Sequence, residues 1–169
     1  MKRFAVCIVL VALLVFVVGP VPARAATLTA PERQLLALID HVRVEHGLCK
    51  LAVCNCLERA ARSHSREMLN RGYFSHFSYN GDSFVERLVD FGFTMSGCTS
   101  WTAGENIAWG ADGYGSPTAI FSAWMHSPPH RRVILCARFR KVGLGRAEGT
   151  FGGLCDVALF TLDCGARTW

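Results

Sequence analysis

Apolar residues recur every three or four positions over the first two thirds of the chain, as in helices that pack one face on a core. This spacing predicts helices that begin at the capping box of residues 29–32, at about Asn55, at Ser83 and at Ser116. The first three should end at glycines, the usual C-terminal stop of a helix: Gly47, Gly72 and Gly92.

The hydrophobic period changes late in the chain. Residues 141–146 and 154–162 are short runs rich in Val, Leu and Phe, which predict a β-hairpin with its turn at residues 148–150. The glycine-rich segment 110–116 predicts a flexible loop. Helices followed by a terminal hairpin indicate an α+β fold rather than a repeating βαβ unit.

Residues 1–25 have the pattern of a signal peptide. Lys2 and Arg3 precede the apolar run 4–18, and Ala23-Arg24-Ala25 offers a small-residue cleavage site. The apolar run is short for a membrane span, which needs about 20 residues. We therefore expect a secreted, extracellular protein without a stable transmembrane anchor, in which residues 26–169 form a single domain.

Removal of this leader changes the charge balance. The whole chain has 18 Lys and Arg against 13 Asp and Glu, and the loss of Lys2, Arg3 and Arg24 leaves 15 against 13, a net charge of +2. This charge is too small, and the arginines too scattered, to indicate a nucleic-acid partner.

Cysteine usage agrees with export. Cys7 lies in the leader, and seven cysteines follow it: Cys49, Cys54, Cys56, Cys98, Cys136, Cys155 and Cys164. In an oxidising compartment they predict three disulfides and one odd thiol, which is buried, reactive or bonded to another chain. The pairing stays open. A zinc site formed by Cys49, Cys54 and Cys56 is disfavoured, because the Cys-x-Cys spacing is unusual for structural zinc.

Three motifs carry the candidate chemistry: residues 72–76, 104–108 and 124–131. They contain His76, Glu105 and His130, which we expect to meet in a polar cleft. Two imidazoles suit zinc, and Glu105 could be the third ligand, orient a ligand, or act as a general base beside a zinc-bound water. Alternatively, Glu105 accepts hydrogen bonds from buried amides while the histidines bond each other or Ser127.

Two further histidines have simpler interpretations. His64 lies on the apolar stripe of the second helix and is expected to pack in the core. His126 precedes His130 by four residues, but Pro128 and Pro129 prevent a regular helix between them, so His126 should be exposed.

The order of these motifs resembles the CAP superfamily of cysteine-rich secretory, antigen and pathogenesis-related proteins, and its bacterial SCP-like branch most closely. The matching segments are Phe74-Ser75-His76, Gly104-Glu105-Asn106-Ile107-Ala108, Trp124 with Ser127-Pro128-Pro129-His130-Arg131, and Val142-Gly143-Leu144-Gly145. The resemblance covers residues 31–165. It implies a three-layer α-β-α sandwich, in which helices flank a small, mostly antiparallel sheet.

The resemblance also implies a cleft of two histidines and two glutamates. His76, His130 and Glu105 match three of these positions, and the second glutamate is replaced by Ser127. Pro129 stands where glycine is usual, and Cys164 stands where phenylalanine is common, which suggests a lineage-specific disulfide. The missing carboxylate argues against acid–base catalysis, which usually needs two groups of separated pKa.

Three functions fit these patterns. The favoured one is an extracellular binding module whose cleft holds a lipid or a cell-envelope component, as the resemblance allows. The second is a zinc-dependent hydrolase, peptidase-like, that uses His76, His130 and Glu105. The third is a structural envelope protein joined to a partner through the odd cysteine. The sequence leaves the ligand, the metal content and the oligomeric state open.

Overall fold

A computed structural model describes residues 27–169, so the predicted signal peptide and Cys7 lie outside the described residues. The elements in chain order are α1 (Ala30–Glu45), β1 (Ala52–Val53), α2 (Asn55–Arg71), α3 (Phe84–Asp90), β2 (Ser100–Ala111), the 3-10 turn η1 (Asp112–Gly115), α4 (Pro117–His126), α5 (Pro128–Ile134), β3 (Lys141–Phe151) and β4 (Leu154–Thr168). Within residues 27–169, no helix is long and apolar enough to cross a bilayer.

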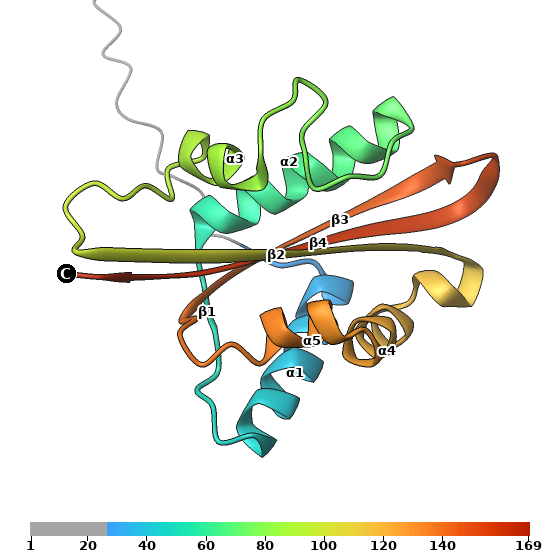
Figure 1. Ribbon diagram of the computed structural model, residues 1–169. Helices are drawn as coiled ribbons and strands as arrows, with labels where there is room; N and C mark the ends of the chain where they lie inside the picture. The colour runs from blue at the N-terminus through green and yellow to red at the C-terminus, as the bar shows by residue number, and fades with distance from the viewer. Residues whose placement is uncertain (1–26) are drawn as a thin grey trace, which may run out of the picture.

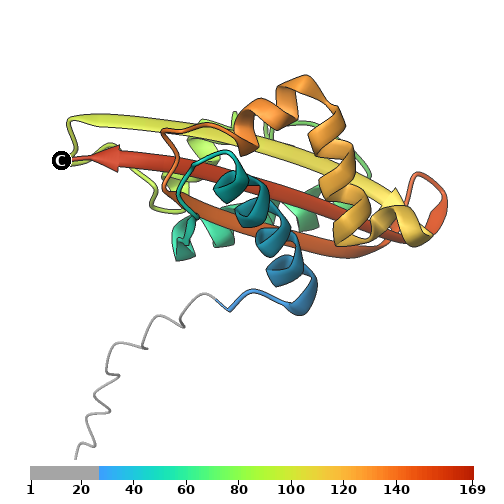
Figure 2. The same cartoon turned by 90° about the horizontal axis from the view of Figure 1, so that it is seen from below.

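The four strands form one sheet in the order β1-β3-β4-β2. The short β1 runs parallel to β3, whereas β3–β4 and β4–β2 are antiparallel. Helices α2 and α3 cover one face of this sheet, and α1, α4 and α5 cover the other (Figure 1). Figure 2, seen from below, shows the second group lying across the long strands. The predicted α+β sandwich of three layers is confirmed.

Alternation along β3 supplies both faces of the sheet. Val142 and Leu144 face the largest core cluster, where they meet residues of α1, α4 and α5 such as Trp124. Gly143 and Gly145 face α2, whose backbone at Leu57 and Ala61 lies too close for any side chain. The absence of a Cβ on this face lets the helix pack directly on the strands.

Helix boundaries follow the capping chemistry. α1 and α3 begin at capping boxes, and the Ser116 side chain accepts the Ala119 amide at the start of α4. Gly72 ends α2 in the left-handed conformation, with φ of 68°. His126 ends α4 and is exposed, as the two prolines predicted, whereas the separate helix that begins at Pro128 was not predicted.

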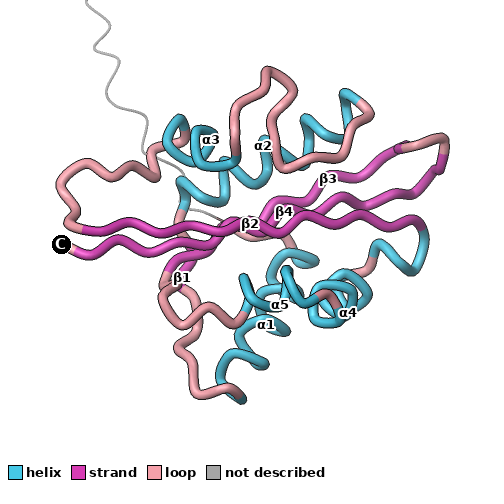
Figure 3. The backbone as a smooth tube through the Cα atoms, in the orientation of Figure 1, coloured by secondary structure: helices cyan, strands magenta, loops and turns pink. Residues whose placement is uncertain are grey.

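Two local predictions were wrong. The hairpin turn lies at Gly152–Gly153 rather than at 148–150, because β3 continues through Phe151. The segment 110–116 is not an open loop: Gly110 and Ala111 belong to β2, and residues 112–115 form η1. Figure 3 shows the loops that remain, including the long connections on either side of α3.

The disulfide prediction also needs correction. The structure joins Cys54 to Cys56, and leaves five described cysteines free: Cys49, Cys98, Cys136, Cys155 and Cys164. Cys98 precedes β2 at one end of the sheet, whereas Cys155 lies in β4 beside the hairpin turn at the other end. About ten residues of strand, at roughly 3.3 Å each, separate these two ends, so Cys98 and Cys155 cannot pair within one chain.

Candidate functional site

Glu105 lies at the centre of the candidate site. Its carboxylate is 1% exposed and is held from two sides. His76 Nδ1 donates to Oε1 at 2.8 Å, and the buried Arg87 guanidinium of α3 donates to Oε2. A buried carboxylate is stable only when its charge is compensated, and Arg87 supplies that compensation. The arrangement fixes Glu105 as an anion that orients His76.

Side chains of α2 and α3 anchor the loop that carries His76. His64 of α2 is fully buried, as predicted, and its Nε2 donates to the Ser75 carbonyl at 2.8 Å. Arg87 donates to the Ser78 hydroxyl at 2.7 Å. Burial, followed by the positive charge of Arg87, lowers the pKa of His64, so this histidine stays neutral at physiological pH. Hydrogen bonds from His64 and Arg87 therefore hold the His76 loop in place.

His76 itself remains accessible, with 49% of its side chain exposed. Because Nδ1–H donates to Glu105, Nε2 is the ring nitrogen that is left to bind a ligand. His130 lies on α5, where Asn106 Nδ2 donates to its carbonyl at 3.0 Å. Burial and then the nearby charge of His76 lower the pKa of His130. The two imidazoles are thus within electrostatic reach of each other.

Ser127 stands between α4 and α5 and is the N-cap residue of α5, which carries His130. Its carbonyl accepts the Arg131 amide at 2.9 Å, which closes the first turn of that helix. Ser127 and His130 are separated by two residues of the chain, and no side-chain hydrogen bond joins them among the described residues.

A second carboxyl group underlies the site. Asp163 of β4 pairs directly with Glu105 of β2 in the antiparallel register, so both side chains lie on one face of the sheet. Asp163 is completely buried, and neither of its carboxyl oxygens accepts a hydrogen bond in the described part of the chain, whereas a hydrogen bond with Glu105 contributes to its raised pKa. Burial, and then the charge of Glu105, raise the pKa of Asp163 well above its usual range. Asp163 therefore keeps its proton where an ordinary aspartate loses it.

The donor set is a poor match for a three-ligand zinc site. Both oxygens of Glu105 are engaged, one by His76 and one by Arg87. Over residues 27–169, no three His, Cys, Asp or Glu side chains are arranged to hold a metal ion together. The geometry favours Glu105 as the residue that orients His76 rather than as a third ligand.

Sequence reasoning missed Arg87 and Asp163. Arg87 lies in the last turn of α3, where a basic residue is ordinary, and Asp163 follows an apolar run. An aspartate directly after a mostly apolar stretch of the strand was an available signal, since buried aspartates need a special environment. Their contact with Glu105 depends on strand register and on the packing of α3, which the sequence does not display.

Comparison with known proteins gives a family match over most of the chain. The model of the cysteine-rich secretory protein family (CAP) matches residues 36–162. The uncharacterized protein YkwD of Bacillus subtilis is 32% identical over 123 residues, which are 73% of this chain and 45% of that protein. The uncharacterized membrane protein YlbC of the same organism is 35% identical over 121 residues, covering 69% and 32%. The chain thus spans less than half the length of these relatives.

Solved structures share the fold. An extracellular protein of Bacillus anthracis that contains an SCP domain is 26% identical, with a TM-score of 0.61 over 83% of this chain and 44% of that one. An outer surface protein of Borrelia burgdorferi is 19% identical, with a TM-score of 0.65 over 80% and 92%. Venom allergen-like protein 4 of Schistosoma mansoni is 12% identical, with a TM-score of 0.57 over 84% and 92%.

Proposed function

The chain belongs to the cysteine-rich secretory protein family, and from that premise we propose that it is an extracellular binding module. Residues 1–25 are removed as a signal peptide, and residues 26–169 act as the domain. The ligand is a lipid or another amphipathic component of the cell envelope, bound at the cleft formed by His76, Glu105, Ser127 and His130.

The observation that carries this proposal is the state of His76. Its ring is half exposed, yet its tautomer and direction are fixed by the buried Glu105 carboxylate. A fixed, accessible ring nitrogen is suited to form a hydrogen bond with a polar group of a ligand, because little side-chain entropy is lost on binding. His130, neutral because of its lowered pKa, adds a second hydrogen-bonding group.

Aromatic side chains beside His76 supply the apolar part of the proposed ligand site. Phe74, Phe77 and Tyr79 belong to the same loop and are 44%, 56% and 61% exposed. Exposed aromatic groups next to a fixed polar group are typical of sites for amphipathic ligands. Their presence in one loop supports a ligand with a polar head and an apolar body.

The same geometry gives less support to a hydrolase. A general base needs a free carboxylate oxygen within reach of water, whereas both oxygens of Glu105 are occupied. Asp163 is sealed from solvent and holds its proton. Binding needs only hydrogen-bonding groups, such as the accessible ring of His76.

Lipid retention tests the proposal. The exported protein would be incubated with a total envelope lipid extract, re-isolated, and analysed by native mass spectrometry. We expect a bound species that is reduced about tenfold in His76→Ala and in His130→Ala, as for the loss of one buried hydrogen bond to a ligand. His41→Ala, a 75% exposed histidine of α1, is the matched control and should retain the ligand.

Metal analysis separates the binding module from the hydrolase. Protein made without a histidine tag would be dialysed against zinc and its metal content measured. One zinc per chain, lost in both cleft variants and accompanied by peptidase activity that Glu105→Gln abolishes, would replace our proposal with the hydrolase. Retained lipid without such activity supports the binding module.

A further inference from the structure

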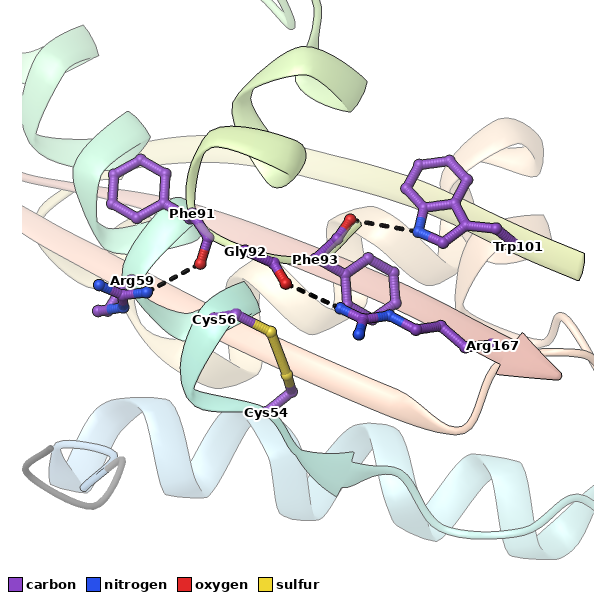
Figure 4. The surroundings of a disulfide bond; sticks show 8 residues. All are labelled: Cys54, Cys56, Arg59, Phe91, Gly92, Phe93, Trp101 and Arg167. Carbon is purple, nitrogen blue, oxygen red and sulfur yellow. Dashed lines mark hydrogen bonds between the residues drawn. A yellow bond between two sulfur atoms is a disulfide. The ribbon is translucent and has the colours of Figure 1, made fainter. Parts of the chain in front are cut away.

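A pocket lies at the end of the sheet where β4 finishes, and none of the residues of the proposed histidine cleft line it. It has a volume of about 270 Å³. Three cationic residues line it, Arg140, Lys141 and Arg167, together with the aromatic residues Phe93 and Trp169, and no acidic residue of the described chain does so. The Cys54–Cys56 disulfide forms part of its wall (Figure 4). The pocket therefore combines positive charge with an apolar wall.

A neighbouring pocket of about 460 Å³ extends this cationic surface. It shares Arg140 and Arg167 with the first pocket, adds Arg138, and is likewise lined by no acidic residue from positions 27–169. Four cationic side chains thus gather at one end of a domain whose predicted net charge is only +2. Like charges that line one surface repel one another, and a bound anion would reduce that repulsion.

Internal ion pairs do not supply that compensation. Three arginines elsewhere in residues 27–169 pair with carboxylates: Arg62, Arg87 and Arg146. Arg138, Arg140, Lys141 and Arg167 make no ion pair in the same part of the chain; Arg140 instead donates to the carbonyls of Ala137 and Phe139, and Arg167 to that of Gly92. Their positive charge remains available to a ligand.

One of these cations is held in place before any ligand arrives. The Arg167 guanidinium lies 4.2 Å from the centre of the Phe93 ring and donates to the Gly92 carbonyl at 3.0 Å (Figure 4). Trp169 packs against Gly97, where a Cβ would lie 3.3 Å from its ring, yet the residue stays 73% exposed. A planar guanidinium fixed by stacking, with further cations beside it, is the arrangement that recognises phosphate oxygens.

We propose that this pocket, lined by Arg140, Lys141, Arg167 and Trp169, binds the phosphate group of a phosphate ester. The Arg167 fork and the Lys141 ammonium contact the phosphate oxygens, and Trp169 covers the ester's organic part. The pocket also lies at the first turn of α2, since Cys54 is its N-cap, and the positive end of that helix adds to the attraction. The site is independent of the proposed function of the histidine cleft.

Two probes distinguish the sources of such a phosphate. Glycerol 3-phosphate, a soluble ester, would be titrated into the exported protein by calorimetry, and vesicles of phosphatidylglycerol would be compared with vesicles of phosphatidylcholine by co-sedimentation. We expect saturable binding to at least one phosphate probe and a preference for the anionic vesicles. Binding to the soluble ester indicates a free metabolite, whereas binding to vesicles alone indicates a lipid headgroup.

The double variant Arg140→Gln/Lys141→Gln should weaken this binding by about tenfold or more, since it removes two charge-assisted contacts. The matched control is Arg66→Gln/Arg132→Gln, which removes the same charge from exposed positions outside the pocket. Arg167→Lys keeps the charge but loses the planar guanidinium. Its phosphate affinity should lie between those of the pocket double variant and the control variant. Absence of saturable binding to both probes, or equal weakening in the control, would overturn the proposal.

Discussion

At the scale of single residues, the candidate site depends on how charge is distributed between two adjacent carboxyl groups. Glu105 is compensated by Arg87 and by His76, whereas Asp163 has no such partner within the described chain and is deeper in the sheet. Two neighbouring carboxyl groups in a buried place cannot both ionise cheaply. The proton therefore stays on Asp163, and Glu105 carries the charge that orients His76.

This distribution predicts how stability changes with pH. The pKa of Asp163 is raised in the folded state, so its stabilising contribution is complete below its unfolded pKa of about 3.9 and is lost as pH rises through the folded pKa. Asp163→Asn keeps the shape but cannot ionise. We expect its free energy of unfolding, relative to the wild type, to increase with pH above about 4, by at most about 1.4 kcal/mol per pH unit.

Urea unfolding of both proteins at several pH values between about 4 and about 8.5 measures this difference. Subtracting the wild-type curve removes the contributions of His64 and His130, whose lowered pKa values act in the opposite direction and reduce stability as pH falls. Asp90→Asn, an exposed carboxyl in α3, is the control. Parallel pH profiles for wild type and Asp163→Asn would show that Asp163 ionises normally.

The residue scale also shows what a sequence can reveal of a site. His76, Glu105 and His130 stood out because they occupy recognisable motifs, and the structure places His76 on Glu105 at 2.8 Å. Arg87 and Asp163 have no motif of their own. Their role exists only because β2 and β4 pair Glu105 with Asp163 and because α3 brings Arg87 over both. Such contacts between distant segments cannot be inferred from local pattern.

At the scale of elements, local signals fixed most helix boundaries. Capping residues and the glycine stop predicted the ends of α1, α2 and α3 to within about two residues, because these signals act within one turn of helix. Strands were less visible. β2 contains Gly104 and Gly110 and alternates poorly, so its extended form depends on pairing with β4 along its whole length.

The motif Val142-Gly143-Leu144-Gly145 has a structural reason that the sequence alone did not disclose. A Cβ on Gly145 would lie 2.2 Å from the Ala61 carbonyl carbon, so Gly145→Ala would push α2 away from β3. We expect the free energy of unfolding to fall by about 1–3 kcal/mol, the usual cost of overpacking. Thermal unfolding should show a melting temperature lower by about 2–4 °C for each kcal/mol. A Cβ at Gly113 would have no neighbour within 4 Å, so Gly113→Ala should leave the melting temperature nearly unchanged.

At the scale of the whole molecule, cysteine chemistry departs furthest from expectation. The described chain carries one disulfide and five thiols of very different exposure. Cys49 and Cys155 are exposed, and are the thiols through which a partner chain could be attached, whereas Cys164 is fully buried in the core beside Val142. Burial raises the pKa of the Cys164 thiol, which further suppresses its reactive thiolate form.

Thiol labelling of the exported, unreduced protein checks this distribution. We expect Cys49 and Cys155 to react with an alkylating reagent in the native state, and Cys164 to react only after unfolding. Peptide mapping after complete alkylation should find Cys54 and Cys56 joined and five labelled cysteines. Three bridged pairs in that map would restore the original prediction and contradict the structure.

The two proposed sites differ chemically and involve residues of the same four-stranded sheet. Asp163, which pairs with Glu105 across the strands, and Arg167, in the cationic pocket, lie four residues apart on β4, or about 13 Å at strand spacing. Changes this far apart usually add without coupling. Combining His76→Ala with Arg140→Gln/Lys141→Gln should therefore weaken lipid retention and phosphate binding each as much as the separate variants do. Native mass spectrometry would measure lipid retention, and calorimetry would measure phosphate binding. If the combined variant lost more or less affinity than the sum of the separate losses, one ligand would span both sites, with its phosphate at Arg167 and its body reaching His76.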